Sequence, residues 1–545
     1  GVYLPSFNKE FIFNIFPKRK NFLILGSAHS IQEISIKQKQ GCKLIFLAPI
    51  FKVNKKKHFL GVNKFNHLAT NKTAGLIFTT GPGLTNGVSG IAACYYDRVP
   101  LVTLVGQVNS KIHIAKSTNT RMVGFQEVPH LEICKPISDF CLKIESEKKY
   151  LNLRKKFLNS LNTKVQVVEI LDDVQRKILE KKPIKFRKFK KNKLNRNISA
   201  NKSYQNLIKK SKKPVIIIGA GFARDEENLS ILRKIIVTNI PIAITWGGQK
   251  FQKYISKSSN YLGIMGTHNP GTANEFINKS DLVIALGCSL LQHQIGKKHN
   301  DFAPKSKIIF VNDDLNETKR AKLQFGNRLL PIYLDANKFA KDYLLKFKKK
   351  IKTNFIEKNT KSNPVNFLKS IFEKISRNSL IFSDAGATLS WTYQAANCLK
   401  NCPPIFTAFN LHSMGYANCA SVGASIANKK NIYCIIGDGS IPMNSQELAW
   451  LKKYSVKIII LDNRGYGIIR QTQREFYKSK FYGSDFINKK TSLPSFSLEK
   501  LLSSYEIENR RIEKTINKKN LKWILSSKNT KALIYNVKYS DEVVF

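Results

Sequence analysis

The sequence has few acidic residues for its length. Its 545 residues include 37 Asp and Glu against 91 Lys and Arg, which gives a formal net charge of +54 at pH 7. Such an excess of positive charge usually indicates a nucleic-acid partner. The lysines are, however, spread along the whole chain and mixed with Asn and Ile, and no nucleic-acid-binding motif is recognisable. We therefore interpret the charge as compositional drift and expect no nucleic-acid partner.

No apolar run is long enough to cross a membrane, because the longest such runs have the length of a strand. No signal peptide is recognisable either. The nine cysteines lack metal-ligand spacing, and Cys398 and Cys402 are an isolated pair, which favours reduced thiols. We therefore expect a cytoplasmic protein without a membrane partner.

The chain does have enough apolar material for several cores. Its hydrophobic content is 42%, and its length allows three or four domains of ordinary size. Strand-like apolar runs alternate with segments of helical periodicity, and glycine-rich turns follow several of the runs. This pattern is typical of α/β domains with parallel sheets.

The strongest motif lies in the last third of the chain. Residues 433–436 and 456–461 are apolar runs typical of buried parallel strands. Two such strands joined by a helix place their carboxyl ends side by side, where open parallel sheets bind ligands. Asp438 and Asn463 follow the two runs, so we expect their oxygens to lie together. Hard oxygen ligands beside free backbone N–H groups suit a diphosphate held through Mg²⁺.

This stretch, from Gly437 to Gln473, resembles the thiamine diphosphate motif of the acetolactate synthase family, including a trailing Gly-Tyr-Gly-Ile-Ile-Arg-Gln. The resemblance implies that Asp438, Asn463 and the carbonyl of Gly465 bind the metal. The interval between the Gly-Asp-Gly turn and Asn463 is slightly shorter than usual in the family, and Asp462 stands where the family usually has Asn. Neither departure affects a presumed metal ligand. The residues implied here in cofactor binding are Gly437, Asp438, Gly439, Ser440, Asn463 and Gly465.

The resemblance continues towards the N-terminus as far as Thr73. Residues 74–80 are a predicted strand, and the turn 81–87 that follows has glycines that let the backbone approach a ligand closely. This part is similar to the family's pyrimidine-binding domain, as is the segment 124–127. An ordinary cap and a core Phe would be the preferred interpretation if Phe-Gln-Glu stood alone. The resemblance implies cofactor binding by Gly81 and Asn86, and a catalytic position on the substrate side of the thiazolium for Phe125 and Gln126.

A Lys/Arg/Asn-rich linker at residues 177–202 precedes a second α/β domain. Gly219–Gly221 is only half of a dinucleotide fingerprint. In the resembling family the matching domain binds FAD in a structural role. Where the family has an arginine after the end of a strand, this sequence has Ser289. The acidic residues that the family has at the end of another strand correspond here to residues 312–314. These departures argue against FAD.

The third domain begins with a predicted strand at residues 380–383. Met414 and Gly415 precede a helix of small residues. The resemblance places a bulky apolar side chain at Met414, beneath the cofactor, where it forces the bent conformation of thiamine diphosphate. A Met in a small-residue stretch would otherwise be read as core filler.

The first 70 residues do not resemble the front of such an enzyme. Residues 21–25 and 42–50 are predicted strands with a helix over 29–40 between them. This piece resembles the middle of thiamine phosphate synthase, a (β/α)₈ barrel, and represents only two or three of its βα units. A partial barrel cannot close, so we expect no synthase activity from it.

The acetolactate synthase family uses a Glu on the replaced segment to help deprotonate the thiazolium. No Asp or Glu occurs between Glu33 and Asp97. Glu33 itself lies on the predicted helix and not at a strand end. The sequence therefore predicts a competent diphosphate anchor with impaired turnover.

Taken with the resemblance, the sequence predicts an α/β protein with three doubly wound parallel-sheet domains, the first truncated and preceded by a barrel-like βαβ segment. The predicted parts are 1–70 (thiamine phosphate synthase-like), 71–176 (pyrimidine-binding), 203–345 (central) and 364–545 (diphosphate- and Mg²⁺-binding). The resemblance implies a carboligase or decarboxylase of 2-keto acids, acting on pyruvate, with thiamine diphosphate and Mg²⁺, as a homodimer or tetramer.

Several alternatives stay open at this point. Within the thiamine diphosphate class these are a lyase related to surface-sugar assembly and a simple 2-keto acid decarboxylase. Outside that class they are thiamine phosphate synthase activity from the N-terminal piece, and a chimeric product without catalytic activity.

Overall fold

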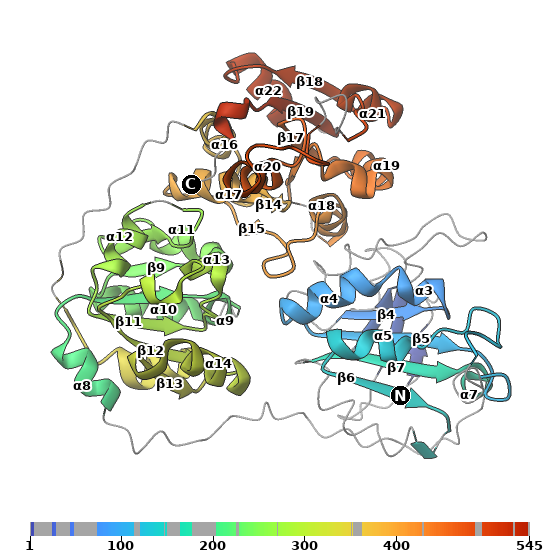
Figure 1. The fold of residues 1–545 in the computed structure, drawn as a ribbon, viewed down its shortest axis with the longest axis horizontal. Helices are drawn as coiled ribbons and strands as arrows, with labels where there is room; N and C mark the ends of the chain where they lie inside the picture. Colours follow the sequence, from blue (N-terminus) through green and yellow to red (C-terminus); the bar gives the residue numbers. More distant parts are fainter. Residues whose placement is uncertain are drawn as a thin grey trace, which may run out of the picture.

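The computed structural model describes residues 2–4, 24–28, 44–47, 74–113, 120–146, 148–149, 164–176, 203–224, 228–269, 271–349, 351, 362–427, 430–485, 493–526 and 529–542. Within these residues the chain forms three sheets whose paired strands are all parallel, and helices flank the sheets (Figure 1). The predicted class of three parallel-sheet α/β domains is therefore confirmed. The linker 177–202 lies outside the described residues.

The first sheet has the strand order β1-β2-β3-β4-β5-β7-β6. Its strands are β1 (Val2–Leu4), β2 (Ile24–Ala28), β3 (Leu44–Leu47), β4 (Ala74–Phe78), β5 (Leu101–Gln107), β6 (Phe140–Ile144) and β7 (Val165–Leu171). The helices of this domain are α3 (Pro82–Thr85), α4 (Val88–Tyr96), α5 (His130–Cys134) and α7 (Asp172–Gln175).

The N-terminal strands join the first sheet. β1 pairs with β2 and β2 with β3, and β3 pairs in parallel with β4, so the segment predicted to be barrel-like continues the sheet of the first domain. Pairing in this way covers the backbone edge that β4 would otherwise expose. β2 overlaps the strand predicted at 21–25 and β3 lies within the strand predicted at 42–50, while residues 21–23, 42–43 and 48–50 of these two predictions, and the predicted helix over 29–40, lie outside the described residues.

The central sheet has the order β10-β9-β8-β11-β12-β13. Its strands are β8 (Pro214–Ile218), β9 (Ile242–Ile244), β10 (Tyr261–Ile264), β11 (Leu282–Leu286), β12 (Lys307–Asn312) and β13 (Leu329–Tyr333). Its helices are α8 (Ser203–Lys210), α9 (Ala220–Ala223), α10 (Asn228–Val237), α11 (Gln252–Ile255), α12 (Thr272–Asn278), α13 (Gln292–Ile295), α14 (Leu315–Phe325) and α15 (Ala336–Phe339). Every residue of β8 and of β11 is buried, as expected for parallel strands covered on both faces.

The third sheet has the order β15-β14-β16-β17-β19-β18. Its strands are β14 (Leu380–Ser383), β15 (Ile405–Phe406), β16 (Ile432–Gly437), β17 (Lys457–Asp462), β18 (Glu508–Ile512) and β19 (Lys531–Asn536). Its helices are α16 (Asn363–Phe372), α17 (Ala387–Asn397), α18 (Tyr416–Ala427), α19 (Leu448–Lys453), α20 (Gly467–Phe476), α21 (Leu498–Ser504) and α22 (Lys518–Ser526).

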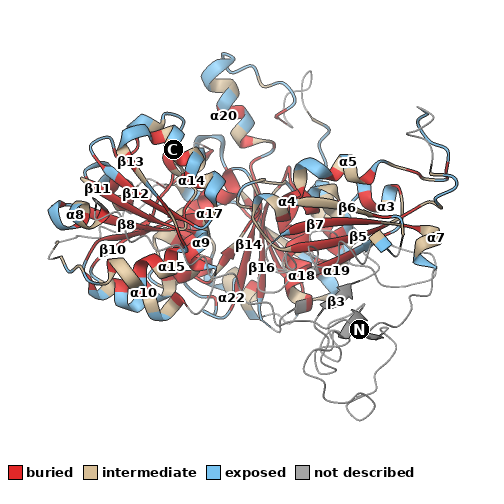
Figure 2. Cartoon of the chain, turned by 90° about the horizontal axis from the view of Figure 1, so that it is seen from below, coloured by how far each residue is buried: buried red, intermediate tan, exposed pale blue. Residues whose placement is uncertain are grey.

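The third domain packs against both of the others. One buried apolar cluster joins it to the central domain through residues such as Trp246 and Tyr393, and another joins it to the first domain through residues such as Phe78 and Ala420. From β4 onwards the strands are mostly buried, with exposed positions on the outer helices (Figure 2). Among the described residues, none of the helices has the length and apolar character needed to span a membrane.

Candidate active site

The ends of β16 and β17 form the core of the candidate site. The two strands pair in parallel with Gly437 opposite Leu461, and the Asp438 N–H donates to the Leu461 carbonyl over 3.3 Å. This register puts Asp438 beside Asn463, the residue that follows β17. Both side chains are buried, with 3% and 7% of their surface exposed. The structure thus brings together the two oxygen ligands expected from the sequence.

Asp438 is a buried carboxylate without an ion-pair partner in the described part of the chain. Its Oδ2 accepts the Gly465 N–H over 2.8 Å. Burial, followed by the charge of Asp462, raises the pKa of Asp438 to about 7. The neighbouring carboxylates differ, since Asp462 is paired with Arg511 over 2.7 Å and Glu542 is paired with Arg470. A divalent cation at Asp438 would compensate the one negative charge that the protein leaves uncompensated there.

The amide of Asn463 has a defined orientation. Its Nδ2 donates to Glu542 Oε1 over 2.9 Å, and Oδ1 makes no hydrogen bond among the described residues. Oδ1 is therefore left available to a metal. Gly465 has φ +141°, and a Cβ there would lie 2.3 Å from the Ser484 carbonyl oxygen, so only glycine fits this position. Together these groups are the hard oxygen donors that Mg²⁺ prefers.

The turn after β16 is tied to a further buried acid. Ser440 is buried and its hydroxyl donates to Asp384, which follows β14. Asp384 also accepts the Gly415 N–H over 3.1 Å and the Ala417 N–H over 2.9 Å. Burial raises the pKa of Asp384 to about 6. Asp384 thereby joins the Gly437–Ser440 turn to the segment that carries Met414.

Met414 is 37% exposed and lies two residues before α18. Gly415 has φ +77°, and a Cβ there would lie 2.5 Å from Asn444 Nδ2. Asn444 Nδ2 also donates to the Gly415 carbonyl over 3.2 Å. Gly439 is equally restricted, because a Cβ there would lie 2.4 Å from the Tyr466 ring. The Met-Gly step and the Gly-Asp-Gly-Ser turn are therefore parts of one closely packed unit.

The first domain brings together a second set of predicted residues. A Cβ on Gly81 would lie 2.7 Å from the Gln126 carbonyl oxygen, and Thr80 Oγ1 donates to that same oxygen over 3.1 Å. Gln126 itself has φ +60°, and Phe125 is 81% exposed. Asn86 is the exposed C-cap residue of α3. In the described residues no hydrogen bond joins this set to Asp438 or Asn463, and the two sets belong to the domains of the first and third sheets.

Sequence reasoning missed a buried polar network beneath the Gly81 turn. The Gly81 N–H donates to His130 Nε2 over 2.9 Å, which leaves the proton on Nδ1, 2.9 Å from Glu169 Oε2. Gln107 Nε2 also donates to Glu169, over 3.0 Å. The available signal was a glutamate, Glu169, within the mostly apolar strand β7. These hydrogen bonds hold the Gly81 turn in place, and they leave the Glu169 carboxylate already bonded to His130 and Gln107.

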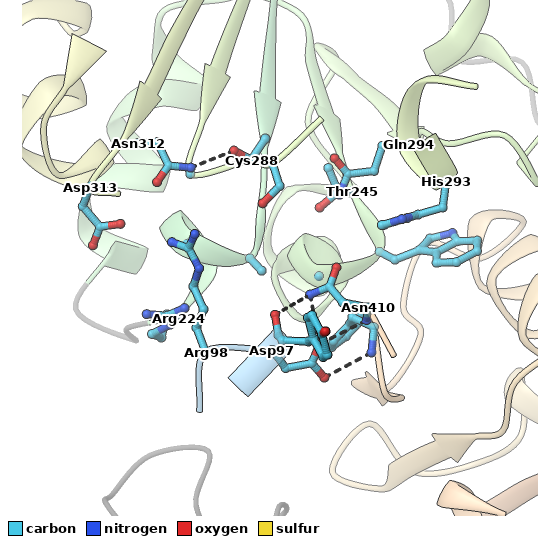
Figure 3. A pocket seen from close by; sticks show the side chains of 18 residues that line it. Asp97, Arg98, Arg224, Thr245, Cys288, His293, Gln294, Asn312, Asp313 and Asn410 are labelled. Carbon is cyan, nitrogen blue, oxygen red and sulfur yellow. Dashed lines mark hydrogen bonds between the residues drawn. The ribbon is translucent and has the colours of Figure 1, made fainter. Parts of the chain in front are cut away.

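A cleft lies where the three domains meet (Figure 3). Arg98 comes from the first domain, Arg224 and His293 from the central domain and Asn410 from the third. Arg98 is paired with Asp314 over 2.7 Å. Asp97 accepts the Asn410 N–H over 3.1 Å and so ties the first domain to the third.

The glycine turn at this cleft is closed by the chain itself. A Cβ on Gly219 would lie 2.3 Å from the Gly287 carbonyl oxygen, so these glycines are required by backbone packing. Asn312 Nδ2 donates to the Cys288 carbonyl over 2.9 Å, and Asp314 caps α14. The Ser289 carbonyl accepts from Arg320. Asn312 and Asp314, two of the three residues in the strand-end run, are therefore engaged within the domain.

Three histidines pack on Trp246 beside this cleft. The His293 and His412 ring centroids lie 5.8 and 6.4 Å from that of Trp246, and His268 lies 5.9 Å away. Tyr393 of α17 stacks on the same indole at 5.0 Å. Burial, followed by His412 and His268, lowers the pKa of His293 to about 4. The folded protein thus holds this imidazole neutral at pH values where an unfolded chain would protonate it.

This lowered pKa predicts an acid-sensitive interface between the central and third domains. Because the unfolded state binds the proton more tightly, the stability is fully present above pH 6.5 and is lost as pH falls towards 4. Between pH 7 and pH 5, wild-type protein should lose about 2 kcal/mol more unfolding free energy than the His293→Gln variant. Urea unfolding of both proteins at the two pH values measures the difference. Equal losses would contradict the assignment.

Comparisons with known proteins cover the same three domains. Residues 65–128 match the family model of the N-terminal TPP binding domain of thiamine pyrophosphate enzymes, residues 202–342 match the central domain, and residues 384–532 match the C-terminal TPP binding domain. The match to the C-terminal domain contains both Asp438 and Asn463. The chain belongs to the thiamine pyrophosphate enzymes.

Relatives define the type within that family. The chain is 27% identical over 495 residues to the probable acetolactate synthase large subunit of Methanococcus aeolicus, covering 82% of this chain and 78% of that protein. It is 28% identical over 484 residues to the acetolactate synthase large subunit of Cyanidium caldarium, with the same coverage. For the isozyme 2 large subunit of Escherichia coli the identity is 25% over 429 residues, covering 76% of each. The protein is a thiamine-diphosphate-dependent enzyme of the acetolactate synthase type.

Proposed function

We propose that this protein converts pyruvate to 2-acetolactate by decarboxylating one 2-keto acid and joining the remaining two-carbon unit to a second. The observation that carries the proposal is the buried, unpaired Asp438 carboxylate beside the free amide oxygen of Asn463. Relatives named acetolactate synthase support the choice of substrate and product. Thiamine diphosphate supplies the chemistry that stabilises the carbanion after carbon dioxide leaves.

The chain's own residues would bind and orient the cofactor. Asp438, Asn463 and the carbonyl of Gly465 would hold Mg²⁺, which in turn would bind the diphosphate. The sequence led us to expect free N–H groups at Gly439 and Ser440, but the Gly439 N–H donates to Asp438 and the Ser440 N–H donates to the Gly437 carbonyl over 3.1 Å. Met414 would hold the cofactor by apolar contact. Gln126, whose carbonyl accepts a hydrogen bond from Thr80 Oγ1, would lie with Phe125 on the substrate side. These roles are proposed from the resemblance, and the burial of Asp438 and Asn463 supports the metal-binding part of them.

We further propose a homodimer or larger assembly. The Gly81–Gln126 set and the Asp438–Asn463 set belong to the domains of the first and third sheets, without a hydrogen bond between them in the described residues. Phe125, 81% exposed, and Met122, 58% exposed, present apolar surface beside Gln126. A second copy that places its third domain against this surface would bury these side chains and complete the site.

Product analysis tests the proposal. The purified protein is incubated with pyruvate, thiamine diphosphate and Mg²⁺, and the products are separated. Acetolactate as the product supports the proposed function. Acetaldehyde alone would indicate a simple decarboxylase, and the absence of any product at long times, despite bound cofactor, would indicate a chain without catalytic activity. Either of these two results overturns the proposal.

We expect the central domain to bind no flavin. The Gly219 turn is filled by the Gly287 backbone, and the side chain of Asn312 is bonded to a backbone carbonyl. The residues present therefore do not fit the phosphate and ribose of a dinucleotide. Protein purified after growth with excess riboflavin should show no absorbance band near 450 nm. A stoichiometric band that survives gel filtration would contradict this expectation.

A further inference from the structure

Glu542 is a buried acid close to the end of the chain. It follows β19 and the short turn Tyr539–Asp541, and its surface is 0% exposed. Its carboxylate accepts hydrogen bonds from Asn463 Nδ2 over 2.9 Å and from Arg470 Nε over 3.1 Å, and a further one from a terminal nitrogen of Arg470. A terminal nitrogen of Arg474 lies 3.4 Å from Oε2 of Glu542. A carboxylate 79 residues from Asn463 in sequence is thus in direct contact with it.

Arg470, on α20, is also 0% exposed and has all of its donors engaged. Besides Glu542, its guanidinium donates to the backbone carbonyls of Asn463 over 2.7 Å, Arg464 over 2.8 Å and Ser484 over 3.1 Å. The Tyr539 ring lies 4.6 Å from the guanidinium carbon. The charge of Glu542 therefore balances a cation that holds the backbone of the presumed metal-binding loop.

The contact between Glu542 and Asn463 decides which end of the amide faces the metal. An ionised carboxylate only accepts hydrogen bonds, so Asn463 must present its NH₂ to Glu542 and its oxygen to the opposite side. Gly467 confines the amide further, because a Cβ there would lie 2.5 Å from Asn463 Nδ2. A neutral partner in place of Glu542 would allow the amide to turn over and present NH₂ to the cation.

We propose that Glu542 is a positioning residue for the metal site, which orients the Asn463 amide and, through Arg470, holds the loop that contains the Gly465 carbonyl. The proposal rests on the proposed function, since it assumes that Asn463 binds Mg²⁺. Groups in this outer position around a metal contribute about 10–100-fold to metal affinity. The C-terminal segment is thereby part of the cofactor-binding apparatus without touching the cofactor.

The test measures cation affinity in Glu542→Gln and Glu542→Asp. Glu542→Gln removes the negative charge. Glu542→Asp keeps the charge opposite Arg470, but its shorter side chain no longer reaches Asn463. Because the buried charge pair is kept, Glu542→Asp is expected to fold even if Glu542→Gln does not. Asp541→Asn is the matched control, because Asp541 lies in the same segment and bonds the exposed Asn363. The Mg²⁺ and Ca²⁺ concentrations that half-saturate thiamine diphosphate binding are measured by fluorescence, and folding is verified by urea unfolding.

Both Glu542 variants should need about 10–100-fold more Mg²⁺, while the control stays within twofold of wild type. Mg²⁺ requires nearly ideal octahedral geometry whereas Ca²⁺ tolerates irregular ligands, so Mg²⁺ binding should weaken more than Ca²⁺ binding. Folded variants that bind Mg²⁺ like wild type, or that lose both cations equally, would overturn the proposal. Wild-type protein that binds no thiamine diphosphate with Mg²⁺ would instead refute the proposed function.

Discussion

Replacing Asp438 with Asn is expected to weaken Mg²⁺-dependent binding of thiamine diphosphate by about 10²–10³-fold. The expected loss corresponds to about 3–4 kcal/mol, the range found when one partner of a buried charge pair is removed. Asp438 is the presumed ligand with a full negative charge, whereas Asn463 and Gly465 would contribute only dipoles. Isothermal titration of the cofactor at fixed Mg²⁺ measures the change.

The same substitution should have the opposite effect on the protein without cofactor. Burial raises the pKa of Asp438 to about 7, so its contribution to stability is fully present below pH 4 and is lost as pH rises through 7. Asp438→Asn removes this loss and should stabilise the cofactor-free protein at pH 8 by roughly 4 kcal/mol. A substitution that stabilises the cofactor-free protein but weakens cofactor binding is typical of a cation ligand.

Asp462→Asn is the control for this prediction. Asp462 lies next to the presumed ligands but is paired with Arg511, and the resembling family usually has Asn at this position. Mg²⁺-dependent cofactor binding should therefore persist in Asp462→Asn. If Asp438→Asn and Asp462→Asn bound the cofactor equally well, the metal site would have to be sought elsewhere.

Turnover is expected to fall about 10²–10⁴-fold below the rate of an enzyme with the activating Glu, the usual cost of losing a proton-transfer group. The sequence has no Asp or Glu between Glu33 and Asp97. Two carboxylates in the described part of the first domain lie near the Gln126 turn, and both are engaged. Glu127 accepts the Gly124 N–H over 2.9 Å and pairs with His113, while Glu169 pairs with His130. Neither is available to a pyrimidine nitrogen.

The deprotonation step can be measured apart from product formation. Bound thiamine diphosphate is mixed with D₂O, quenched in acid and examined by NMR for exchange at C2 of the thiazolium. Slow exchange together with unimpaired cofactor binding would agree with a missing proton-transfer group. Exchange as fast as in a member of the family that retains the Glu would show that another group performs this task.

Local patterns predicted the elements that carry the presumed metal ligands. The mostly apolar runs at 433–436 and 456–461 correspond to β16 and β17, as expected because strands buried on both faces are rich in apolar residues. Parallel pairing then places the two strand ends together, and Asp438 and Asn463 with them. The pattern of the N-terminal segment alone does not reveal that β3 pairs with β4.

The sequence by itself determined the family, the three parallel-sheet domains and the identity of the presumed metal ligands, since these depend on short-range patterns of apolar runs, glycines and polar strand ends. Only the tertiary structure decided the partners of those ligands. Glu542 contacts Asn463, Asp384 ties Ser440 to Gly415, and His130 fixes Gly81, each across a long stretch of chain. Such pairs leave no local trace in the sequence, because the contact arises from the packing of elements that are distant along the chain.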